Sequence, residues 1–211
     1  MAFQRARTNN QIQKRQNDIL NACSKVFDNH GYDEITLKMI SDETAISRTT
    51  MYTYYKTKED IFLDLIEREY LTWYDTLLNQ FHDQMDRVTF CKILATTLLS
   101  QKQFLRLLSI QNTIIEQNSD PAHLVDFKKR TAVIFDAFEQ GLTTTFPQSN
   151  KSDRDCFIVH FLIYSLGFYP YMHPNQKQIQ SLQQADVQVP EINDEQLLYD
   201  GIFRLTSSLA K

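Results

Sequence analysis

Glycine and proline are scarce in this chain of 211 residues, which contains four of the first and five of the second. An all-β fold needs a turn about every 8–12 residues, and glycine and proline supply many of those turns. The four glycines are also too far apart for G-x-G-x-x-G or G-x-x-x-x-G-K, the loops that hold nucleotide phosphates. The scarcity therefore argues against a β-sandwich or barrel, excludes these phosphate-binding loops, and predicts an all-α fold.

Cysteine is scarce as well, and the three cysteines, Cys23, Cys91 and Cys156, lie far apart with no C-x-x-C pair. This spacing predicts neither a disulfide framework nor a zinc finger, and it favours a reducing compartment. Cys23 and Cys91 fall on apolar stripes and are expected in the core.

A metal site is considered at Cys156 and His160, which stand four residues apart and so share one face of a helix. Further ligands would have to come from His123 or His173, and no clear set emerges. We therefore predict a core cysteine beside a hydrogen-bonded histidine, with no metal and no cofactor.

No apolar run is long enough for a membrane span. The longest, residues 156–171, has 16 residues and is interrupted by His160, Ser165, Gly167 and Pro170, whereas a span needs about 20. The first residues also lack the apolar stretch of a secretory signal. We expect no membrane partner and a cytoplasmic location.

Negative charge dominates the whole chain but not its beginning. The net charge is −4, yet residues 1–15 hold Arg5, Arg7, Lys14 and Arg15 and no acid. Residues 1–58 carry nine Lys and Arg against six Asp and Glu, whereas residues 59–211 carry 13 against 20. A basic front end on an acidic body suggests that the front end meets a polyanion, although a solvated basic tail would look the same.

Helical periodicity covers most of the chain. Apolar spacing and capping residues predict helices at about 10–30, 36–43, 47–55, 58–81, 87–101, 103–117, 121–146, 153–169 and 194–209. Residues 170–192 are rich in Gln and Pro and are predicted to be a loop.

Two short predicted helices, 36–43 and 47–55, follow a longer first helix and are separated by a tight turn. This arrangement is typical of a helix-turn-helix, whose second helix enters the major groove of DNA. In helix 47–55 only Met51 and Tyr55, four residues apart, need to face the core. The other side chains suit phosphates and base edges.

The same segment resembles the tetracycline-repressor (TetR) family of DNA-binding regulators. The resemblance lies in GYDEITLKMI at 31–40, Ile46-Ser47, and MYTYYKTKEDI at 51–61, and it covers about residues 10–65. Two positions depart from the family pattern: Ala45 stands where glycine is usual in the turn, and Thr49 stands where a small residue is usual. Both departures affect which operator sequence the protein would recognise, and neither removes the match to the motif.

The resemblance implies a DNA-binding domain at 1–56 and an effector-binding and dimerisation domain at 57–211. It places Arg48 on a guanine edge, Thr49 and Thr53 on base edges or thymine methyl groups, and Lys38 on a flanking base or phosphate. The implied DNA-binding set is Thr36, Lys38, Ser47, Arg48, Thr49, Thr50, Tyr52, Thr53, Tyr54 and Lys58.

For the helical body, the resemblance implies a small-molecule cavity between the middle helices and a dimer interface on the last two. An aromatic lining suits a lipophilic or aromatic effector, although ordinary core packing explains any single ring equally well. The expected pocket residues are Trp73, Tyr74, Phe104, Phe127, Phe135, Phe138 and Tyr164, and the expected dimer residues are Phe157, Phe161, Phe168, Ile202, Phe203 and Leu209.

The sequence contains no recognisable catalytic motif, such as H-E-x-x-H or G-x-S-x-G. We therefore predict a non-enzymatic, homodimeric transcriptional regulator, a repressor released from a palindromic operator on double-stranded DNA by a small-molecule effector. Two alternatives remain: a DNA-binding regulator without a small-molecule inducer, and a helical protein-interaction adaptor.

Overall fold

The computed structural model describes the backbone of residues 2–209 and the side chains of residues 10–209. Every regular element in this part of the chain is helical, and no strand occurs in it, so the predicted all-α fold is confirmed. The side chains of Arg5 and Arg7 lie outside the described residues.

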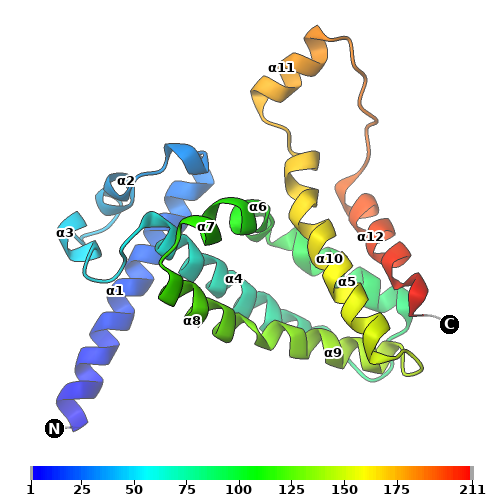
Figure 1. Cartoon of the computed structure of the whole chain (residues 1–211), viewed down its shortest axis with the longest axis horizontal. Coiled ribbons are helices and arrows are strands. Elements are labelled where there is room, and N and C mark those ends of the chain that lie inside the picture. Colours follow the sequence, from blue (N-terminus) through cyan, green and yellow to red (C-terminus); the bar gives the residue numbers. More distant parts are fainter. Residues whose placement is uncertain (1, 210–211) are drawn as a thin grey trace. The chain divides into compact units, whose positions relative to one another are not determined.

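The helices and helical turns are labelled as in Figure 1. In chain order they are α1 (Ala2–Asn29), a 3₁₀ turn (Tyr32–Glu34), α2 (Leu37–Asp42), α3 (Arg48–Met51), α4 (Lys58–Gln80), α5 (Arg87–Ser100), α6 (Lys102–Ile110), a π-helical turn (Gln111–Ile115), α7 (Glu116–Asn118), α8 (Pro121–Thr131), α9 (Val133–Thr145), α10 (Lys151–Met172), α11 (Gln176–Gln184), α12 (Asp194–Leu205) and a final 3₁₀ turn (Thr206–Ser208).

The chain forms two compact units, and neither is continuous in sequence. The first unit consists of residues 1–69 and 111–130, and the second consists of residues 70–110 and 131–211. This division differs from the predicted functional boundary between residues 56 and 57, because the start of α4, the π-helical turn, α7 and most of α8 belong to the first unit. The functional boundary stays a prediction.

The core of the first unit is built by the apolar stripe of α1 against the start of α4. Cys23 and Phe27 are buried, and the ring of Phe27 meets that of Phe62 edge-on with centroids 5.3 Å apart. The ring of Tyr32 also meets that of Phe62 edge-on, with centroids 5.1 Å apart. Burial raises the pKa of the Cys23 thiol to about 12. Cys23 is therefore the core residue that its position predicted.

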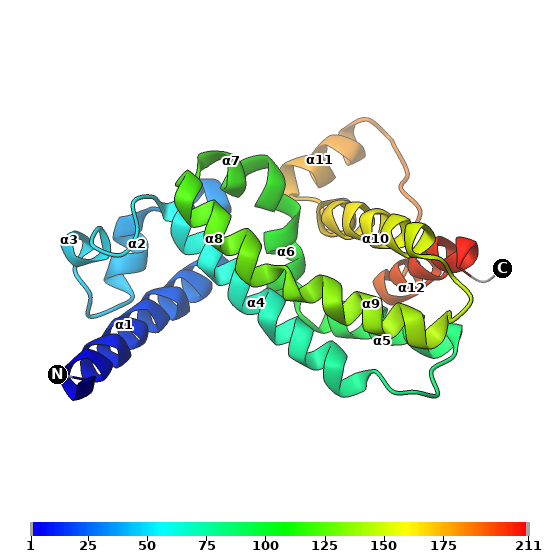
Figure 2. The ribbon, with the colours of Figure 1, turned by 60° about the horizontal axis from the view of Figure 1, so that its bottom comes forward.

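Trp73 on α4 is buried at the centre of the second unit. Its indole nitrogen donates to the hydroxyl of Thr97 at 2.9 Å, and its ring lies 5.6–6.0 Å from the rings of Phe104, Phe138 and Phe161. α5, α6, α9, α10 and the end of α4 thus share one aromatic core. In both Figure 1 and Figure 2, α10 and α12 run side by side in this unit, and α11 stands beyond their ends.

Two of the four glycines allow aromatic rings to pack against the backbone of the second unit. A Cβ atom at Gly141 would lie 2.6 Å from the ring of Phe81, and one at Gly201 would lie 2.4 Å from the ring of Tyr164. Contacts this short do not occur, so glycine is required for close packing at both positions.

The helix boundaries differ from the sequence predictions in several places. α1 begins at Ala2 instead of about residue 10, and α3 ends at Met51 instead of residue 55. The predicted helix 121–146 is two helices, because the pairing changes at Ala132, whose carbonyl accepts from Phe135 three residues later. α10 begins earlier than predicted, with Asn150 as its N-cap, and continues past Pro170 to Met172. The predicted loop 170–192 contains α11, which is capped by reciprocal bonds between Asn175 and Gln178.

Candidate DNA-binding surface

Both helices of the predicted helix-turn-helix begin at a side-chain cap. The hydroxyl of Thr36 accepts from the backbone of Met39 at 3.3 Å, and the hydroxyl of Ser47 accepts from the backbone of Thr50 at 3.2 Å. These bonds satisfy amide groups that a helix start leaves unpaired. The proton of the Thr36 hydroxyl stays available to an acceptor, so Thr36 can serve as a cap and as a phosphate contact. The Ser47 hydroxyl also lies 3.0 Å from the hydroxyl of Thr50, so one of these two protons is used between them.

The turn between α2 and α3 is closed by side chains instead of a glycine. The hydroxyl of Thr44 accepts from the backbone of Ile46 at 2.6 Å, and that of Ser41 donates to the carbonyl of Ile46 at 3.0 Å. Among the described residues only Asp186 has a positive φ, so Ala45 is not strained. The departure from the family's usual glycine therefore costs this turn nothing in backbone conformation.

Two buried residues fix this segment on its inner side: Met51, the last residue of α3, and Tyr55, which follows α3; both are buried as predicted. The hydroxyl of Tyr55 donates to the carboxylate of Asp64 at 2.8 Å. Burial first, and then the neighbouring carboxylate, raise the pKa of Tyr55 well above its usual value. α3 is thereby held on the first unit by its apolar side, with its polar side turned outward.

The outward side of the helix-turn-helix carries most of the predicted DNA contacts. The exposed members of the predicted set are Thr36, Lys38, Ser47, Arg48, Thr49, Tyr52 and Thr53, and the half-buried members are Thr50, Tyr54 and Lys58. The hydroxyl of Thr53 donates to the carbonyl of Thr50 at 2.7 Å, which leaves its methyl group and lone pairs outward. α2, α3 and the residues beside them therefore leave most of the predicted contact residues open to solvent.

Lys58 does not fit the role of a phosphate contact. Its ammonium group donates to the carbonyls of Tyr32 at 3.3 Å and Ile35 at 3.1 Å, and it lies 4.2 Å from the centroid of the Tyr32 ring. Two of its three protons are thus used inside the first unit. We assign Lys58 to holding the 3₁₀ turn before α2, and not to DNA.

Arg15 joins this surface, although it was outside the predicted contact set. Its guanidinium donates to the hydroxyl of Tyr54 at 3.2 Å, and this bond raises the pKa of Arg15 above its usual value. The basic cluster at 1–15 was the sequence signal, but only the structure shows that α1 delivers Arg15 beside the residues that follow α3.

A chain of polar contacts links the segment after α3 to α8 within the first unit. The buried carboxylate of Asp60 accepts from the backbone of Lys56, Thr57 and Asp120, at 3.1, 3.1 and 2.8 Å. Lys56 also pairs with the side chain of Asp120 at 2.5 Å, which lowers the pKa of that carboxyl.

A second link meets Asp64, the carboxylate that holds Tyr55. Its other oxygen lies 2.7 Å from Nε2 of His123 and 3.6 Å from Arg130, which also pairs with Glu67 at 2.6 Å. The hydrogen bond to Asp64 raises the pKa of the His123 imidazole. His123 is therefore a partner of the Asp64 carboxylate in the first unit.

Cys156 and His160 do share a face of α10, with the thiol sulfur 3.7 Å from Nδ1 of the imidazole, but both are exposed. The expected core position of Cys156 is therefore wrong, because the stripe that faces the core is the neighbouring one. Across the described residues no group of three or more His, Cys, Asp or Glu side chains is placed to hold a metal ion.

The predicted effector-pocket residues fall into separate environments. Trp73, Phe104 and Phe138 meet in the core of the second unit, whereas Phe127 is buried in the first. Phe135 is 48% exposed, because it lies on the outer side of α9. Tyr74 and Tyr164 are half-buried, and the hydroxyl of Tyr164 donates to the carbonyl of Leu197 at 2.8 Å.

The predicted dimer residues pack inside a single chain. Phe157, Phe161, Phe168, Ile202 and Leu209 are buried in the second unit. Phe203 is half-buried under the guanidinium of Arg87, 3.8 Å from its ring centroid. A side chain that its own subunit covers offers little surface to a partner. The residues of the dimer interface stay a prediction.

A capped helix pair with a polar outer face and a buried inner face, placed beside a basic helix, defines a helix-turn-helix DNA-binding protein. The chain belongs to the TetR family. The family model for bacterial regulatory proteins of the tetR family matches residues 19–65, and the model for the tetracyclin repressor-like C-terminal domain matches residues 67–202. Proteins of this family are non-enzymatic transcriptional regulators that bind DNA and act as dimers.

Individual proteins are also similar to this chain, over part of its sequence or in its fold. An uncharacterised HTH-type transcriptional regulator, YfiR of Bacillus subtilis (strain 168), is 37% identical over 54 residues, which span 26% of each chain. The crystal structure of a TetR family transcription regulator from Marinobacter aquaeolei VT8 covers 93% of this chain and 97% of its own, with a TM-score of 0.52 at 17% identity.

The crystal structure of AmtR from Mycobacterium smegmatis covers 92% of this chain and 84% of its own, with a TM-score of 0.49 at 18% identity.

None of the helices in the described part of the chain is both long enough and apolar enough to cross a membrane.

Proposed function

We propose that this regulator is a repressor that occupies a palindromic operator as a homodimer and leaves it when a small molecule binds. The observation that supports release most directly is the course of α4. Its first half lies in the unit that holds α3, and its second half carries Trp73 into the aromatic core of the other unit. A change at Trp73 therefore acts on the same helix that seats the DNA-reading elements.

The proposed reading surface divides into base and phosphate contacts. Arg48, Thr49 and Thr53 are exposed on and after α3 and suit base edges, with the Arg48 fork matching O6 and N7 of guanine. Thr36, Ser47, Thr50, Tyr52 and Tyr54, together with Lys38 and Arg15, suit the phosphates on either side.

The dimer face that we propose is the exposed side of α10. Val159 and Ile163 are 54% and 62% exposed, although both are large and apolar. Gly167 continues the same face one turn later, and a Cβ atom there would meet nothing within 4 Å. A line of apolar and small residues spaced four apart lets a second helix approach closely.

The effector that we propose acts on the Trp73 cluster. The rings of Trp73, Phe104, Phe138 and Phe161 are in direct contact, with centroids between 5.2 and 6.0 Å apart. A lipophilic or aromatic molecule would bind by displacing one of these rings, and that displacement would reach α4.

A regulator that works on chromosomal DNA acts in the cytoplasm, which is the location that we propose.

The test is selection of bound DNA from a random pool with the full-length protein, followed by a search for small molecules that release the selected site. A two-fold dimer requires inverted half-sites whose centres lie about one helical turn, roughly 34 Å, or a multiple apart. Recovery of single asymmetric sites would contradict the palindrome. Binding that no small molecule weakens would favour the alternative regulator without an inducer, and no selective binding at all would favour the adaptor.

A further inference from the structure

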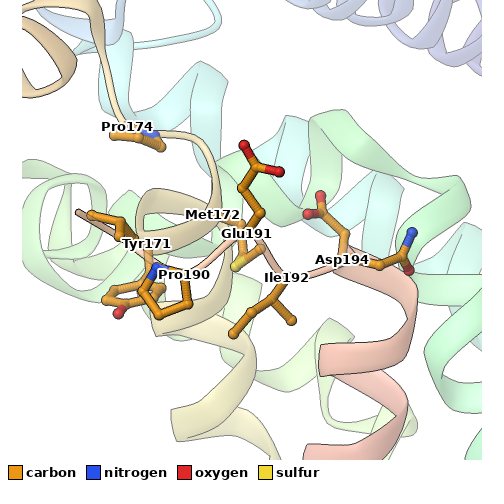
Figure 3. Close-up of a pocket in the computed structure, with 9 residues that line it drawn as sticks. Tyr171, Met172, Pro174, Pro190, Glu191, Ile192 and Asp194 are labelled. Atoms are coloured by element: carbon orange, nitrogen blue, oxygen red, sulfur yellow. The ribbon is translucent and has the colours of Figure 1, made fainter.

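A pocket of about 480 Å³ opens where the segment between α10 and α12 leaves and rejoins the second unit (Figure 3). It is formed by the last turn of α10, the turn at Pro174 and the stretch 189–194 that leads into α12. All of its lining residues belong to the second unit. Its volume lies in the range of pockets that hold small organic molecules, about 300–1,000 Å³.

The wall of this pocket is apolar and open to solvent. Tyr171 is 73% exposed, and Val189 and Ile192 also leave large apolar side chains in contact with water. Covering such surface is favourable. Pro174 and Pro190 restrict the backbone on both sides of the opening, so less conformational freedom is lost when a ligand is bound.

The rim of the pocket carries negative charge. Glu191 and Asp194 line it, no Lys or Arg does, and Figure 3 shows both carboxylates on the same side of the loop. His173 lies 3.2 Å from the carboxylate of Asp194 and offsets it when protonated. Within residues 10–209, Glu191 makes no hydrogen bond or ion pair, so its charge is not compensated.

We propose that this pocket binds a monovalent organic cation with an aromatic or branched apolar body. The body packs on Tyr171 and Ile192, and the carboxylate of Glu191 at the rim attracts the charge. A divalent metal ion does not suit the site, because metal ions of this kind need several oxygen ligands and one of the two carboxylates already faces His173. An organic anion would be repelled.

The experiment is calorimetric titration of the full-length protein without DNA, using tetraphenylphosphonium as the probe and tetraphenylborate as its control. The two ions have nearly the same shape and opposite charge. We expect one tetraphenylphosphonium to bind per chain, and tetraphenylborate to bind at least tenfold more weakly. Because binding is measured without DNA, its failure would leave the proposed repressor function untouched.

Three variants test whether the cation binds in this pocket. Glu191→Gln should weaken tetraphenylphosphonium about fivefold, as loss of one partly exposed charge pair predicts. Glu195→Gln removes a carboxylate four residues further along the chain, which does not line the pocket, and should leave affinity unchanged. Ile192→Ser should weaken binding by about tenfold through loss of apolar contact.

Three results would overturn the proposal. Equal affinity for the two ions would show that they bind to apolar surface without regard to charge. Equal effects of Glu191→Gln and Glu195→Gln would show that the cation is attracted by the overall negative charge and not by Glu191. Absence of cation binding, together with a shift toward monomer for Ile192→Ser in light scattering, would show that a second copy of the chain covers this surface instead.

Discussion

At the scale of single residues, the basic side chains near α3 have different tasks. Lys58 donates to the carbonyls of Tyr32 and Ile35, whereas the exposed Lys38 and Arg48 have no such internal role in the contacts described above. A positive charge predicts DNA affinity only when its protons point outward. Substitution of each lysine can therefore distinguish a structural role, which affects stability, from a DNA contact, which affects the salt dependence of binding.

Lys58→Met should lower the free energy of unfolding by about 1–2 kcal/mol, because two carbonyls lose a charged donor and Tyr32 loses its cation. The salt dependence of DNA binding should not change. Lys38→Ala is the control: the slope of log affinity against log salt should fall by about 0.9 for one lost phosphate contact. A lower slope for Lys58→Met would return that residue to the DNA surface.

Arg48→Ala should cost about 1–3 kcal/mol on the preferred operator and little on random DNA, because a bidentate contact to one guanine is lost. The selected sequences should then relax at one base pair in each half-site. If specific and random DNA weaken equally, Arg48 contacts only the backbone.

The sequence predicted the inner side of α3 well and the partners of its outer side poorly. Met51 and Tyr55 follow from helical spacing alone, since positions four apart share a face. The partner of Lys58 did not follow, because the carbonyls of Tyr32 and Ile35 approach it only through tertiary packing. Arg15 was visible as charge, but its contact with Tyr54 joins residues 39 apart.

At the scale of elements, α8 is tied to the segment after α3 by Asp60 and Asp64. His123 of α8 has a raised pKa because it is hydrogen-bonded to Asp64. The groups around this pair are Tyr55, Asp60, Arg130 and, through Arg130, Glu67. Stability from a raised histidine pKa is fully present below the unfolded value of about 6.5 and is lost as the pH rises through the folded pKa.

His123→Gln should therefore destabilise the protein by about 1–2 kcal/mol near pH 6, and the difference from the unmodified chain should shrink as the pH approaches 9. Thermal unfolding between these limits measures it. His82→Gln, at an exposed histidine outside this cluster, is the control and should give no such pH-dependent difference. If the loss of stability in His123→Gln does not change with pH, the packing of the imidazole and not its charge stabilises α8.

α10 shows why the sequence alone does not distinguish a core face from a dimer face. The helix has apolar residues on two sides: Phe157, Phe161 and Phe168 on one, and Val159 and Ile163 on another. Periodicity identifies both stripes but does not say which one the chain covers itself. The larger rings fill the core of the second unit because they bury more area, and the smaller aliphatic side chains remain outside.

Ile163→Asp should place an unpaired charge in the proposed α10 interface and shift the dimer to monomer, with loss of operator binding and little change in monomer stability, because Ile163 is exposed within the chain. Light scattering and operator titration measure the two effects. Val125→Asp changes another exposed aliphatic residue, on α8, and serves as the control. A dimer that survives Ile163→Asp would place the interface elsewhere.

At the scale of the whole molecule, the proposed release of DNA requires the effector and the operator to oppose one another through α4. By linkage, each must weaken the other by the same factor. Trp73 is the only tryptophan, so its emission reports on the aromatic core directly. We expect an effector that lowers operator affinity to change Trp73 fluorescence, and operator DNA to weaken the effector equally. Release without this reciprocity would mean competition at the DNA surface.

The discontinuous first unit also has a consequence for synthesis of the chain. Its residues 1–69 are made first, but Asp120, His123 and Arg130, which bind the segment after α3 and the start of α4, are made about sixty residues later. At roughly 5–20 residues per second a ribosome needs about 3–12 s for this interval. During those seconds the nascent helix-turn-helix lacks its supports, so a growing chain still attached to its ribosome does not yet hold α3 as the finished protein does.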